Sequence, residues 1–381
     1  MARYKSYRCA AIVILVLSLL ILQGHFMGAK WPWPNMLAMP RASQINVIQQ
    51  AAIVVKTQRQ QNTLNRPNFQ AGIIFPQTGT NAYGPQDTNW QSGLSDIADQ
   101  TAARWIALTI NFEQASSSAT SVQATTSTPS PAMVAAGIQL ARSQGYHIFV
   151  QPQLTIQGAQ SWAGYIQFSS QPQAQAWFDS YWHAYQPYIQ AAAQAGADEL
   201  AVGTELERLQ PHWNTQWEQL IARVHGSFPG MLTYDMNWTS MDYAVPDWMH
   251  NANLAAIGVS VYTPLTTTPQ HVPPQNMATL WSKKIGQPLD ALAQTLHKPV
   301  LISEIGYQDS SDALYNPWQM QAKITPDEQE QAAAYNAALQ YVVTDTVLEG
   351  IFFWAWSVPP YAPNNLPAAQ ELYKWYSSSL S

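Results

Sequence analysis

Two glutamates stand at the ends of short apolar runs that lie far apart in the sequence. Glu205 comes just after the run 199–203, and Glu304 comes directly after the run 299–303. Each run predicts a buried strand, where a carboxylate is costly to place unless a partner or a reaction uses it. Two carboxylates that face one another across a single site are the arrangement needed to hydrolyse a glycosidic bond.

These glutamates can meet only if the fold gathers the ends of separate strands, and the chain from Phe69 onward has such a pattern. Short apolar runs alternate with longer amphipathic segments, which indicates parallel strands joined by helical crossovers. The predicted strands are Ala71–Phe75, Trp105–Ile110, His147–Gln151, Glu199–Gly203, Met231–Met236, Ala255–Tyr262, Val300–Glu304 and Gly350–Trp356. The predicted helices are Pro131–Gln144, Ala174–Ala195, Thr215–Val224, Pro288–Leu296 and Asp327–Thr344.

Eight strands in about 310 residues predict an α/β protein of the (β/α)8 TIM-barrel type. The alternative is an open doubly wound sheet, which usually carries a glycine-rich phosphate loop after its first strand. The stretch Gly72–Pro76 offers no such loop. In a barrel, Glu205 follows the fourth strand and Glu304 ends the seventh, so both lie at the catalytic face.

Each glutamate also has a structural alternative. Glu205 could form an ion pair with the nearby Arg208, whereas Glu304 has no basic residue close to it, since Lys298 is at the opposite end of its strand. Glu207, on the loop that carries Glu205, is an alternative catalytic carboxylate.

Four motifs in order resemble glycoside hydrolase family 113. They are Gly203–Leu206, Leu232–Trp238, Ser303–Tyr307 and Phe353–Trp356, and the resemblance covers roughly Phe69 to Tyr376. Their order is quite specific, although any one of them alone would be weak. The resemblance implies a retaining β-mannanase in which Glu205 is the acid/base, Glu304 is the nucleophile, and the hydroxyl of Tyr262 lies beside Glu304.

The same resemblance implies a set of substrate-binding residues at the strand ends: Gln151, Gln153, Asn237, Trp238, Tyr307, Trp354 and Trp356. The third strand departs from the family, because such enzymes often have Lys-Pro-His where this chain has Gln151-Pro152-Gln153. Glutamine can still bond sugar hydroxyls, so the change bears on the choice of mannan more than on hydrolysis.

Other chemistries find less support in the sequence. The eight histidines are scattered and none pair at metal-ligand spacing, and the Gly-x-Ser-x-Gly motif of serine hydrolases is absent. We therefore expect no metal and no organic cofactor. Two alternatives share the same residues: a carbohydrate-binding barrel without turnover, and a transglycosylase.

The composition favours a carbohydrate partner over a nucleic acid. The net charge is −6, only 10% of residues are charged, and no cluster of lysine and arginine lies outside the N-terminus. The 16 tryptophans and 18 tyrosines mostly predict core packing, but some can line a groove for sugar rings. We expect a monomer.

The first 29 residues predict an export signal or a signal anchor. Arg3, Lys5 and Arg8 form a basic start, and the apolar run Cys9–Leu22 follows. The body of the protein is then extracellular or at the cell surface, with membrane contact only through residues 9–29 if they are uncleaved. Residues 30–68 predict a spacer, and residues 69–381 the catalytic domain.

Two segments are expected to decide how a long sugar chain enters the active site. Residues 115–131 are nearly all Ser, Thr, Ala and Gln, which predicts a long mobile loop after the second strand. Residues 265–287 form the other segment. Endo or exo action depends on their shape.

Overall fold

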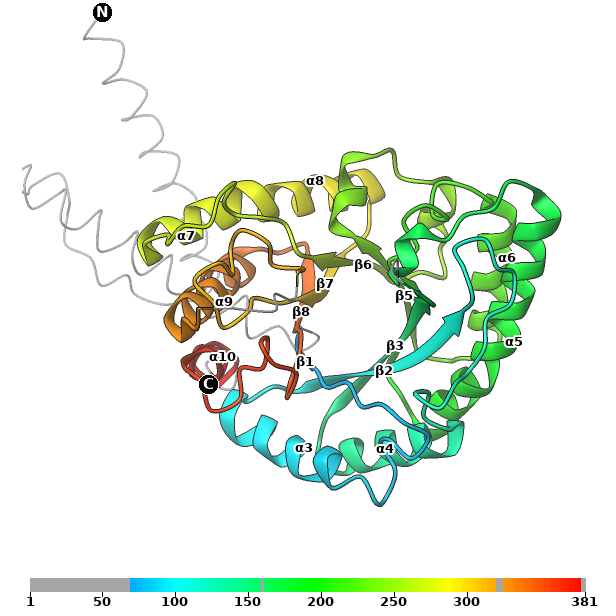
Figure 1. The fold of residues 1–381 in the computed structure, drawn as a ribbon, viewed down its shortest axis with the longest axis horizontal. Coiled ribbons are helices and arrows are strands. Elements are labelled where there is room, and N and C mark those ends of the chain that lie inside the picture. The colour runs from blue at the N-terminus through cyan, green and yellow to red at the C-terminus, as the bar shows by residue number, and fades with distance from the viewer. Residues whose placement is uncertain (1–68, 159–160, 320–324, 378–381) are drawn as a thin grey trace, which may run out of the picture. The chain divides into compact units, whose positions relative to one another are not determined.

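The computed structural model describes residues 69–158, 161–319 and 325–377, which all belong to one compact unit spanning residues 59–381. The predicted signal segment and spacer lie outside the described residues. Figure 1 shows strands forming a central ring with helices around it. The strands form a closed parallel barrel in the order β1 to β8, which confirms the predicted TIM barrel.

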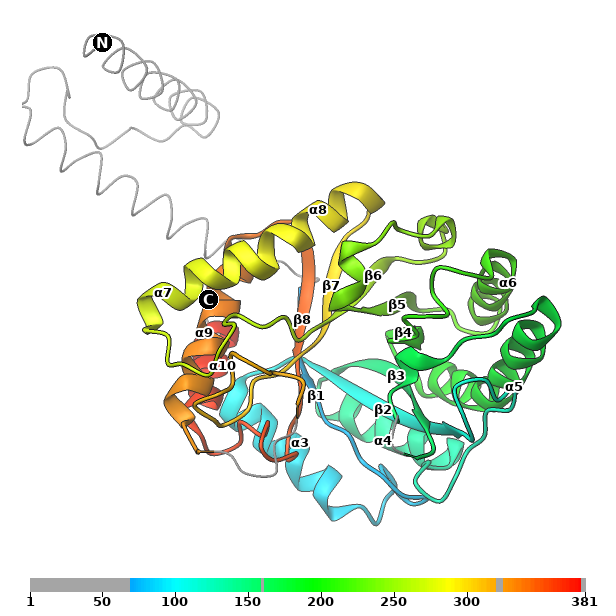
Figure 2. The same ribbon diagram turned by 45° about the horizontal axis from the view of Figure 1, so that its top comes forward.

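Every predicted strand is present, with ends that differ by a few residues. The bounds are β1 Gln70–Ile74, β2 Trp105–Gln114, β3 His147–Ile156, β4 Glu199–Thr204, β5 Met231–Asn237, β6 Ala256–Val261, β7 Val300–Ile305 and β8 Leu348–Phe353. The strands β2 and β3 are longer than predicted, because they continue past the barrel rim as a paired ribbon that reaches Gln114 and Ile156. Figure 2 shows this ribbon on the side of the barrel next to α5.

The five predicted helices are also present. The longer helices are α3 Thr88–Thr101, α4 Pro131–Ser143, α5 Gln171–Ala195, α6 Asn214–His225, α7 Pro274–Trp281, α8 Gln287–Leu296, α9 Glu328–Thr344 and α10 Pro367–Ser377. Short helical turns span Ala163–Tyr165, Trp238–Asp242, Asp247–His250 and Ser282–Gly286. In the described ranges, no helix combines the length and the hydropathy needed to cross a bilayer.

The helices α3, α7 and α10 were not predicted from the sequence, although α3 carries a recognisable signal. Asp87 caps it by accepting a hydrogen bond from the amide of Trp90, and Trp90, Leu94 and Ile97 recur at helical spacing on its buried face. In α10, Ala368, Leu372 and Tyr376 recur four residues apart on the buried face.

The strand residues divide between two cores by the two-residue period of a strand. One set packs outward against the helices. The other forms a separate buried cluster inside the barrel: Ile74, Trp105, Ala107, Phe149, Ala201, Ala256, Leu301 and Phe352. Gly72 makes room for it, because a Cβ atom there would lie 2.3 Å from the ring of Phe352. The barrel is therefore a packed scaffold with functional side chains at one end.

The segment at residues 115–131 is tied to its neighbours. The backbone of Gln123 exchanges two hydrogen bonds with Glu113 of β2, at 2.9 and 3.0 Å. The amide of Val122 bonds the hydroxyl of Ser180 on α5 at 2.9 Å. The expectation of a free mobile loop therefore finds no support in these contacts, which hold the segment against β2 and α5.

Candidate active site

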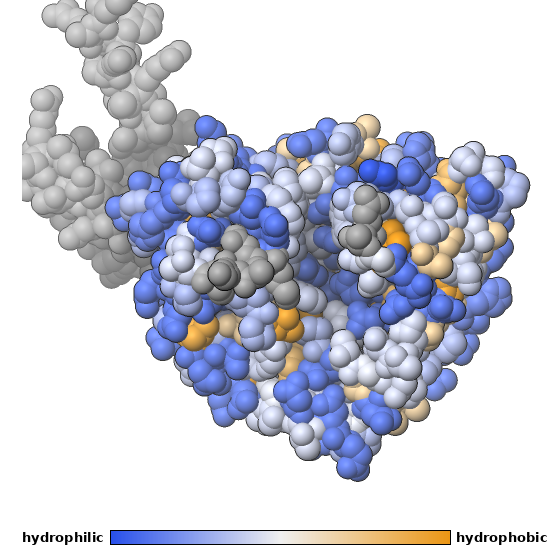
Figure 3. Space-filling model, viewed as in Figure 1, coloured by the Kyte–Doolittle hydropathy of each residue, from blue (hydrophilic) through white to orange (hydrophobic). Residues whose placement is uncertain are grey.

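A cavity of about 730 Å3 opens at the carboxyl ends of the strands. That size suits a small-molecule or oligomer site. Its walls come from segments that follow β3 to β8, and its lining residues are Trp162, Tyr165, Glu205, Asn237, Trp238, Thr239, Tyr262, Glu304, Trp318, Trp354 and Tyr361. Figure 3 shows the surface hollowed over the barrel, with mostly hydrophilic side chains around the hollow.

Glu205 enters this cavity from an unusual backbone conformation. Its φ of 53° lies in the left-handed region, which a non-glycine residue rarely adopts. The amide of Glu205 donates to the carbonyl oxygen of Asp235 at 2.8 Å, and the pairing of β4 with β5 shifts register at this point. The local turn aims the carboxyl group into the cavity, where the indole Nε1 of Trp162 donates to Oε2 at 2.7 Å.

The structural alternative for Glu205 is not realised. Among the described ion pairs none includes Glu205, and the guanidinium of Arg208 instead lies over the ring of Tyr165, 5.0 Å from its centre. Glu207 does not line the cavity. It accepts hydrogen bonds from Nδ2 of Asn237 at 2.8 Å and from the hydroxyl of Thr239, and so holds two lining residues in place.

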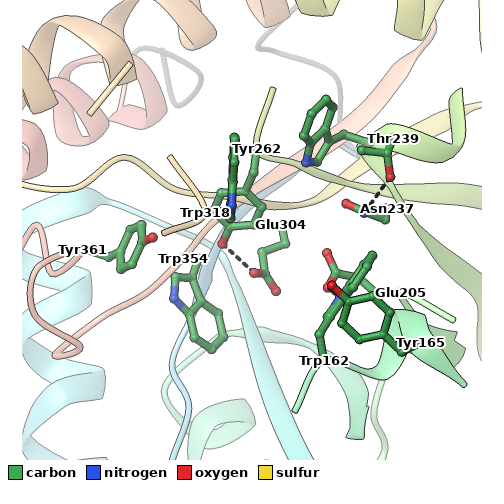
Figure 4. A pocket seen from close by; sticks show the side chains of 11 residues that line it. Trp162, Tyr165, Glu205, Asn237, Thr239, Tyr262, Glu304, Trp318, Trp354 and Tyr361 are labelled. Atoms are coloured by element: carbon green, nitrogen blue, oxygen red, sulfur yellow. Dashed lines mark hydrogen bonds between the residues drawn. The ribbon is translucent and has the colours of Figure 1, made fainter. Parts of the chain in front are cut away.

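Glu304 lies in β7 and is only 9% exposed. The hydroxyl of Tyr262, directly after β6, donates to its Oε1 at 2.5 Å. Figure 4 shows this bond, and it shows the carboxyl groups of Glu304 and Glu205 pointing into the same space. The predicted pair and its predicted tyrosine thus meet in one cavity.

Burial and repulsion govern the charge of the pair. Burial raises the pKa of Glu304 well above its usual value, and the nearby negative charge of Glu205 raises it further. Burial also raises the pKa of Glu205, while hydrogen bonds from Trp162 and Ser260 lower it. Two carboxylates that repel each other without a neutralising cation favour sharing one proton between them. The bond from Tyr262 lowers the pKa of Glu304, which favours the negative charge on that residue.

Three of the predicted substrate-binding residues, Asn237, Trp238 and Trp354, line the cavity. The others do not. Gln151 is fully buried inside the barrel, where its Nε2 donates to the carbonyl of Ser303 at 3.1 Å, and Gln153 stands on the ribbon beyond the rim without reaching the lining.

Tyr307 and Trp356 are each 1% exposed and lie outside the lining. The hydroxyl of Tyr307 accepts from Nε1 of Trp281 on α7, so this side chain faces the helix layer. The backbone of Trp356 bonds back to Ile74 of β1, and its side chain joins the outer core. A place in these motifs therefore does not by itself bring an aromatic side chain into the cavity, because Trp354 lines it whereas Tyr307 and Trp356 do not.

Five lining residues were not predicted from the sequence, and all of them come from connecting segments: Trp162, Tyr165, Thr239, Trp318 and Tyr361. The rings of Trp238 and Trp318 lie 5.9 Å apart and tilted by 35° at the cavity wall. Trp318 is 49% exposed, which is unusual for a tryptophan outside a binding surface, but this exposure is visible only in the structure.

Within the described ranges, one group of side chains has ligand atoms close enough to hold a metal ion: His271, Asp327 and Glu330. None of them lines the cavity. Asp327 caps α9 by accepting from the amide of Glu330 at 3.0 Å, and His271 pairs with Glu330 at 2.6 Å. The hydrogen bond and the ion pair account for the close approach of these three side chains.

The model of Glycoside Hydrolase Family 113 matches residues 79–378. The chain belongs to glycoside hydrolase family 113. It is therefore a glycoside hydrolase, and the resemblance found in the motifs is confirmed. No curated protein sequence matches the chain.

Solved structures share this fold. A β-mannanase of the family from Alicyclobacillus acidocaldarius, in complex with ManMIm, is 21% identical with a TM-score of 0.71, over 83% of this chain and 99% of that chain. Another structure, a β-1,4-mannanase of the family, is 20% identical with a TM-score of 0.70, over 82% and 99%. A family 5 mannosidase from Rhizomucor miehei is 13% identical with a TM-score of 0.54, over 82% and 94%.

Proposed function

We propose that this glycoside hydrolase cleaves β-linked, mannan-type chains with retention of configuration, using Glu304 as nucleophile and Glu205 as acid/base. The observation that carries the proposal is that both carboxyl groups face one cavity while Tyr262 donates to Glu304 alone. The phenol of Tyr262 stabilises negative charge on Glu304, which supports its role as the nucleophile, while the indole of Trp162 donates to Glu205 and orients it.

The reaction then proceeds in two displacements. Ionised Glu304 attacks the anomeric carbon while Glu205 gives its proton to the departing glycosidic oxygen, which forms a glycosyl-enzyme. Once Glu304 is esterified it carries no negative charge, so the repulsion between the two carboxyl groups is relieved and Glu205 can lose its proton more easily. Glu205 then takes a proton from water, which attacks the same carbon and releases the sugar.

The retaining mechanism is supported by the strength of the interaction between the two glutamates. Inverting enzymes hold their carboxyl groups about 6.5–9.5 Å apart to admit a water molecule, whereas retaining enzymes hold them about 5–5.5 Å apart. In this site the charge of Glu205 is the largest electrostatic influence on Glu304 after burial. Figure 4 shows both carboxyl groups directed into the same space, which supports direct attack by one of them.

The cavity walls suit a neutral sugar. Seven of the described lining residues are aromatic, and none is Lys, Arg or His, so the described wall presents no cation to a uronic acid. The aromatic part consists of Trp162, Tyr165, Trp238, Tyr262, Trp318, Trp354 and Tyr361. Flat rings pack on sugar faces, and the carboxamide of Asn237 can bond a hydroxyl. The β-mannanase neighbours favour mannan within this class.

The test is a panel of β-1,4-linked manno-, gluco- and xylo-oligosaccharides, with the anomeric configuration of the first product followed by NMR. We expect cleavage of the manno-oligosaccharides to give the β-anomer first. Products longer than the substrate would show transglycosylation, and binding without turnover would show a carbohydrate-binding barrel. Release of the α-anomer would overturn the roles given to the two glutamates.

We further propose that the protein is exported, on the strength of its basic and apolar N-terminal sequence. N-terminal sequencing of the protein from culture medium and from membranes tests this. A mature N-terminus near residue 30 in the medium supports cleavage, and the intact N-terminus in membranes supports an anchor. Retention of the whole protein in the cytoplasm contradicts export.

A further inference from the structure

A second hollow adjoins the active-site cavity. Its volume is about 310 Å3, at the lower end of the range for small-molecule sites. Its lining includes Trp238, Met241, Asp242, Tyr243, Thr263 and Lys284. Trp238 also lines the active-site cavity, so the two spaces are neighbours.

The second hollow begins at the rim that carries the catalytic glutamates. The turn that starts at Trp238 follows β5 directly, and Thr263 lies two residues after the end of β6. Both walls therefore start at the carboxyl ends of the strands, as Glu205 and Glu304 do. A sugar chain that leaves the active-site cavity past Trp238 meets this hollow.

The connection between β5 and β6 explains why the hollow exists. A TIM barrel usually has a helix after each strand, but residues 238–255 form only the short turns Trp238–Asp242 and Asp247–His250. These turns cover less of α8 than a full helix would. Ala291 of α8 is exposed and forms part of the wall.

Exposed aromatic rings stand in both spaces. In the described part of the chain, three large hydrophobic side chains are exposed: Tyr243 at 66%, Trp318 at 49% and Tyr373 at 48%. Trp318 lines the active-site cavity 5.9 Å from the ring of Trp238, and Tyr243 lines the second hollow. Each space thus has one exposed ring besides the shared Trp238, and flat rings pack on the apolar faces of sugars.

Polar groups of both kinds accompany these rings. Oγ1 of Thr263 is enclosed and has no hydrogen-bond partner among the described residues. Nζ of Lys284 donates to the carbonyl oxygen of Pro264 at 3.2 Å and keeps two hydrogens for other acceptors. Asp242 is exposed and belongs to none of the described ion pairs. Sugar hydroxyls both donate and accept, so they can bond all three groups, and the opposite charges of Lys284 and Asp242 favour a neutral ligand.

We propose that the second hollow is an accessory carbohydrate subsite, which binds a neutral hexose unit of the same β-linked chain away from the bond that is cleaved. This inference rests on the proposed function, because the chain is the one held between Glu205 and Glu304. The two sugar units on either side of the cleaved bond lie in the active-site cavity. Only a longer chain reaches the second hollow, so affinity should increase with chain length.

The first test observes the hollow directly by NMR. The full-length Glu304→Ala variant is labelled with methyl-13C methionine, and the Met241 signal is assigned by its loss in Met241→Leu. We expect this signal to shift when mannohexaose saturates the protein, but not with mannobiose. Met277 is the internal control, because it is fully buried in α7 and lines neither space. An unmoved Met241 signal at saturation with mannohexaose would overturn the proposal.

The second test measures affinity by titration calorimetry in the same Glu304→Ala background. Tyr243→Ala removes the exposed ring, and Ala291→Trp fills the hollow from an exposed position on α8. We expect each change to raise Kd for mannohexaose about 10-fold, and about fivefold more than it raises Kd for mannobiose. Tyr373→Ala, which removes an exposed tyrosine from α10, is the control. Equal losses for the two sugars, or no loss, in the folded variants contradict the assignment.

The two tests separate this inference from the proposed function. Hydrolysis of mannohexaose by the wild type, with Met241 unmoved and Kd unchanged in Tyr243→Ala, would remove the accessory subsite and keep the proposed function. Binding of mannohexaose that shifts Met241 without hydrolysis by the wild type would remove the proposed function and keep the subsite. Absence of binding would contradict both.

Discussion

The hydroxyl of Tyr262 lies 2.5 Å from Oε1 of Glu304 and donates to it. The two residues follow each other around the barrel, Tyr262 directly after β6 and Glu304 within β7. Tyr262 is itself buried, and the charge of Glu304 raises its pKa well above the usual value, so the phenol keeps its proton. It can therefore act only as a donor to Glu304, which fixes that carboxylate and stabilises its charge.

Replacing Tyr262 by Phe tests this relationship. The hydrogen bond lowers the pKa of Glu304, so its loss should raise that pKa and move the acidic limb of the kcat/KM profile to higher pH. We expect kcat/KM to fall about 10–100-fold at the optimum, the range of a lost bond to a charged group. Tyr361→Phe is the matched control, because Tyr361 lines the cavity while its hydroxyl bonds the carbonyl of Pro317. A uniform loss without a moved limb would contradict the assignment.

The two glutamates should respond differently to the leaving group. We expect Glu304→Ala to lower kcat by about 10³-fold or more on every substrate, because no nucleophile remains. Glu205→Gln should slow poor leaving groups by about 10²–10⁴-fold and activated aryl glycosides much less in the first step. Glu207→Gln is the control for removing a carboxyl group from the same loop, and it should not change how the rate depends on the leaving group. Rates of glycosyl-enzyme formation on a series of aryl β-mannosides give the measurement, and equal slowing of all leaving groups by Glu205→Gln would count against its role as acid.

Trp162 should affect Glu205 alone. Its indole lowers the pKa of Glu205, so Trp162→Phe should raise that pKa and extend activity on the basic side of the profile. We expect kcat to fall roughly 10-fold, the value of one hydrogen bond to a charged group. Tyr165→Phe is the comparison, since Tyr165 lines the same cavity. If the basic limb stays in place while kcat falls, Trp162 acts only as part of the cavity wall.

Trp318 should contribute to binding more than to chemistry. It is half exposed at the cavity wall beside Trp238 and touches neither glutamate by a hydrogen bond that the structure shows. We expect Trp318→Ala to raise KM for manno-oligosaccharides about 10-fold, because the buried face of one aromatic contributes 1–2 kcal/mol. Initial rates against chain length provide the check. An unchanged KM for all lengths would show that sugars do not reach this wall.

The charge of Glu199, at the start of β4, should make folding stability depend on pH. This residue is 1% exposed, and burial raises its pKa to about 7, although Gln70 and Thr233 donate to it. A carboxyl group with a raised folded pKa binds its proton more tightly in the folded state, so folding stability falls as pH rises from about 4.5 to 7. Glutamine at this position carries no charge and escapes that loss.

We therefore expect Glu199→Gln to raise the free energy of unfolding by roughly 2–3 kcal/mol at pH 8 and to leave it nearly unchanged at pH 4. Urea unfolding at several pH values measures this difference, with the surface variant Glu371→Gln as control. A stability difference that is constant with pH would show that packing, and not charge, decides the effect.

The sequence by itself determined the barrel and the chemistry at its rim. The alternation of apolar runs with amphipathic segments gave eight strands and five helices correctly, because each strand must bury its side chains in any context. Glu205 and Glu304 could be found because they stand at the ends of such runs, and Tyr262 because it matches the family's position after the sixth strand. The direction of a parallel strand then dictates which end of the barrel receives them.

Tertiary structure decided the rest. Tyr307 and Trp356 occupy motif positions as good as Trp354, yet both are buried in the outer core, where Tyr307 bonds Trp281 of α7. Trp162 and Trp318 reach the cavity from connecting segments whose paths depend on distant contacts. The surroundings of the buried Asp235 have no local sign in the sequence, because they consist of hydroxyls from β6 and β7. Side-chain periodicity is a local property, whereas the neighbours of a buried charge exist only after the barrel has closed.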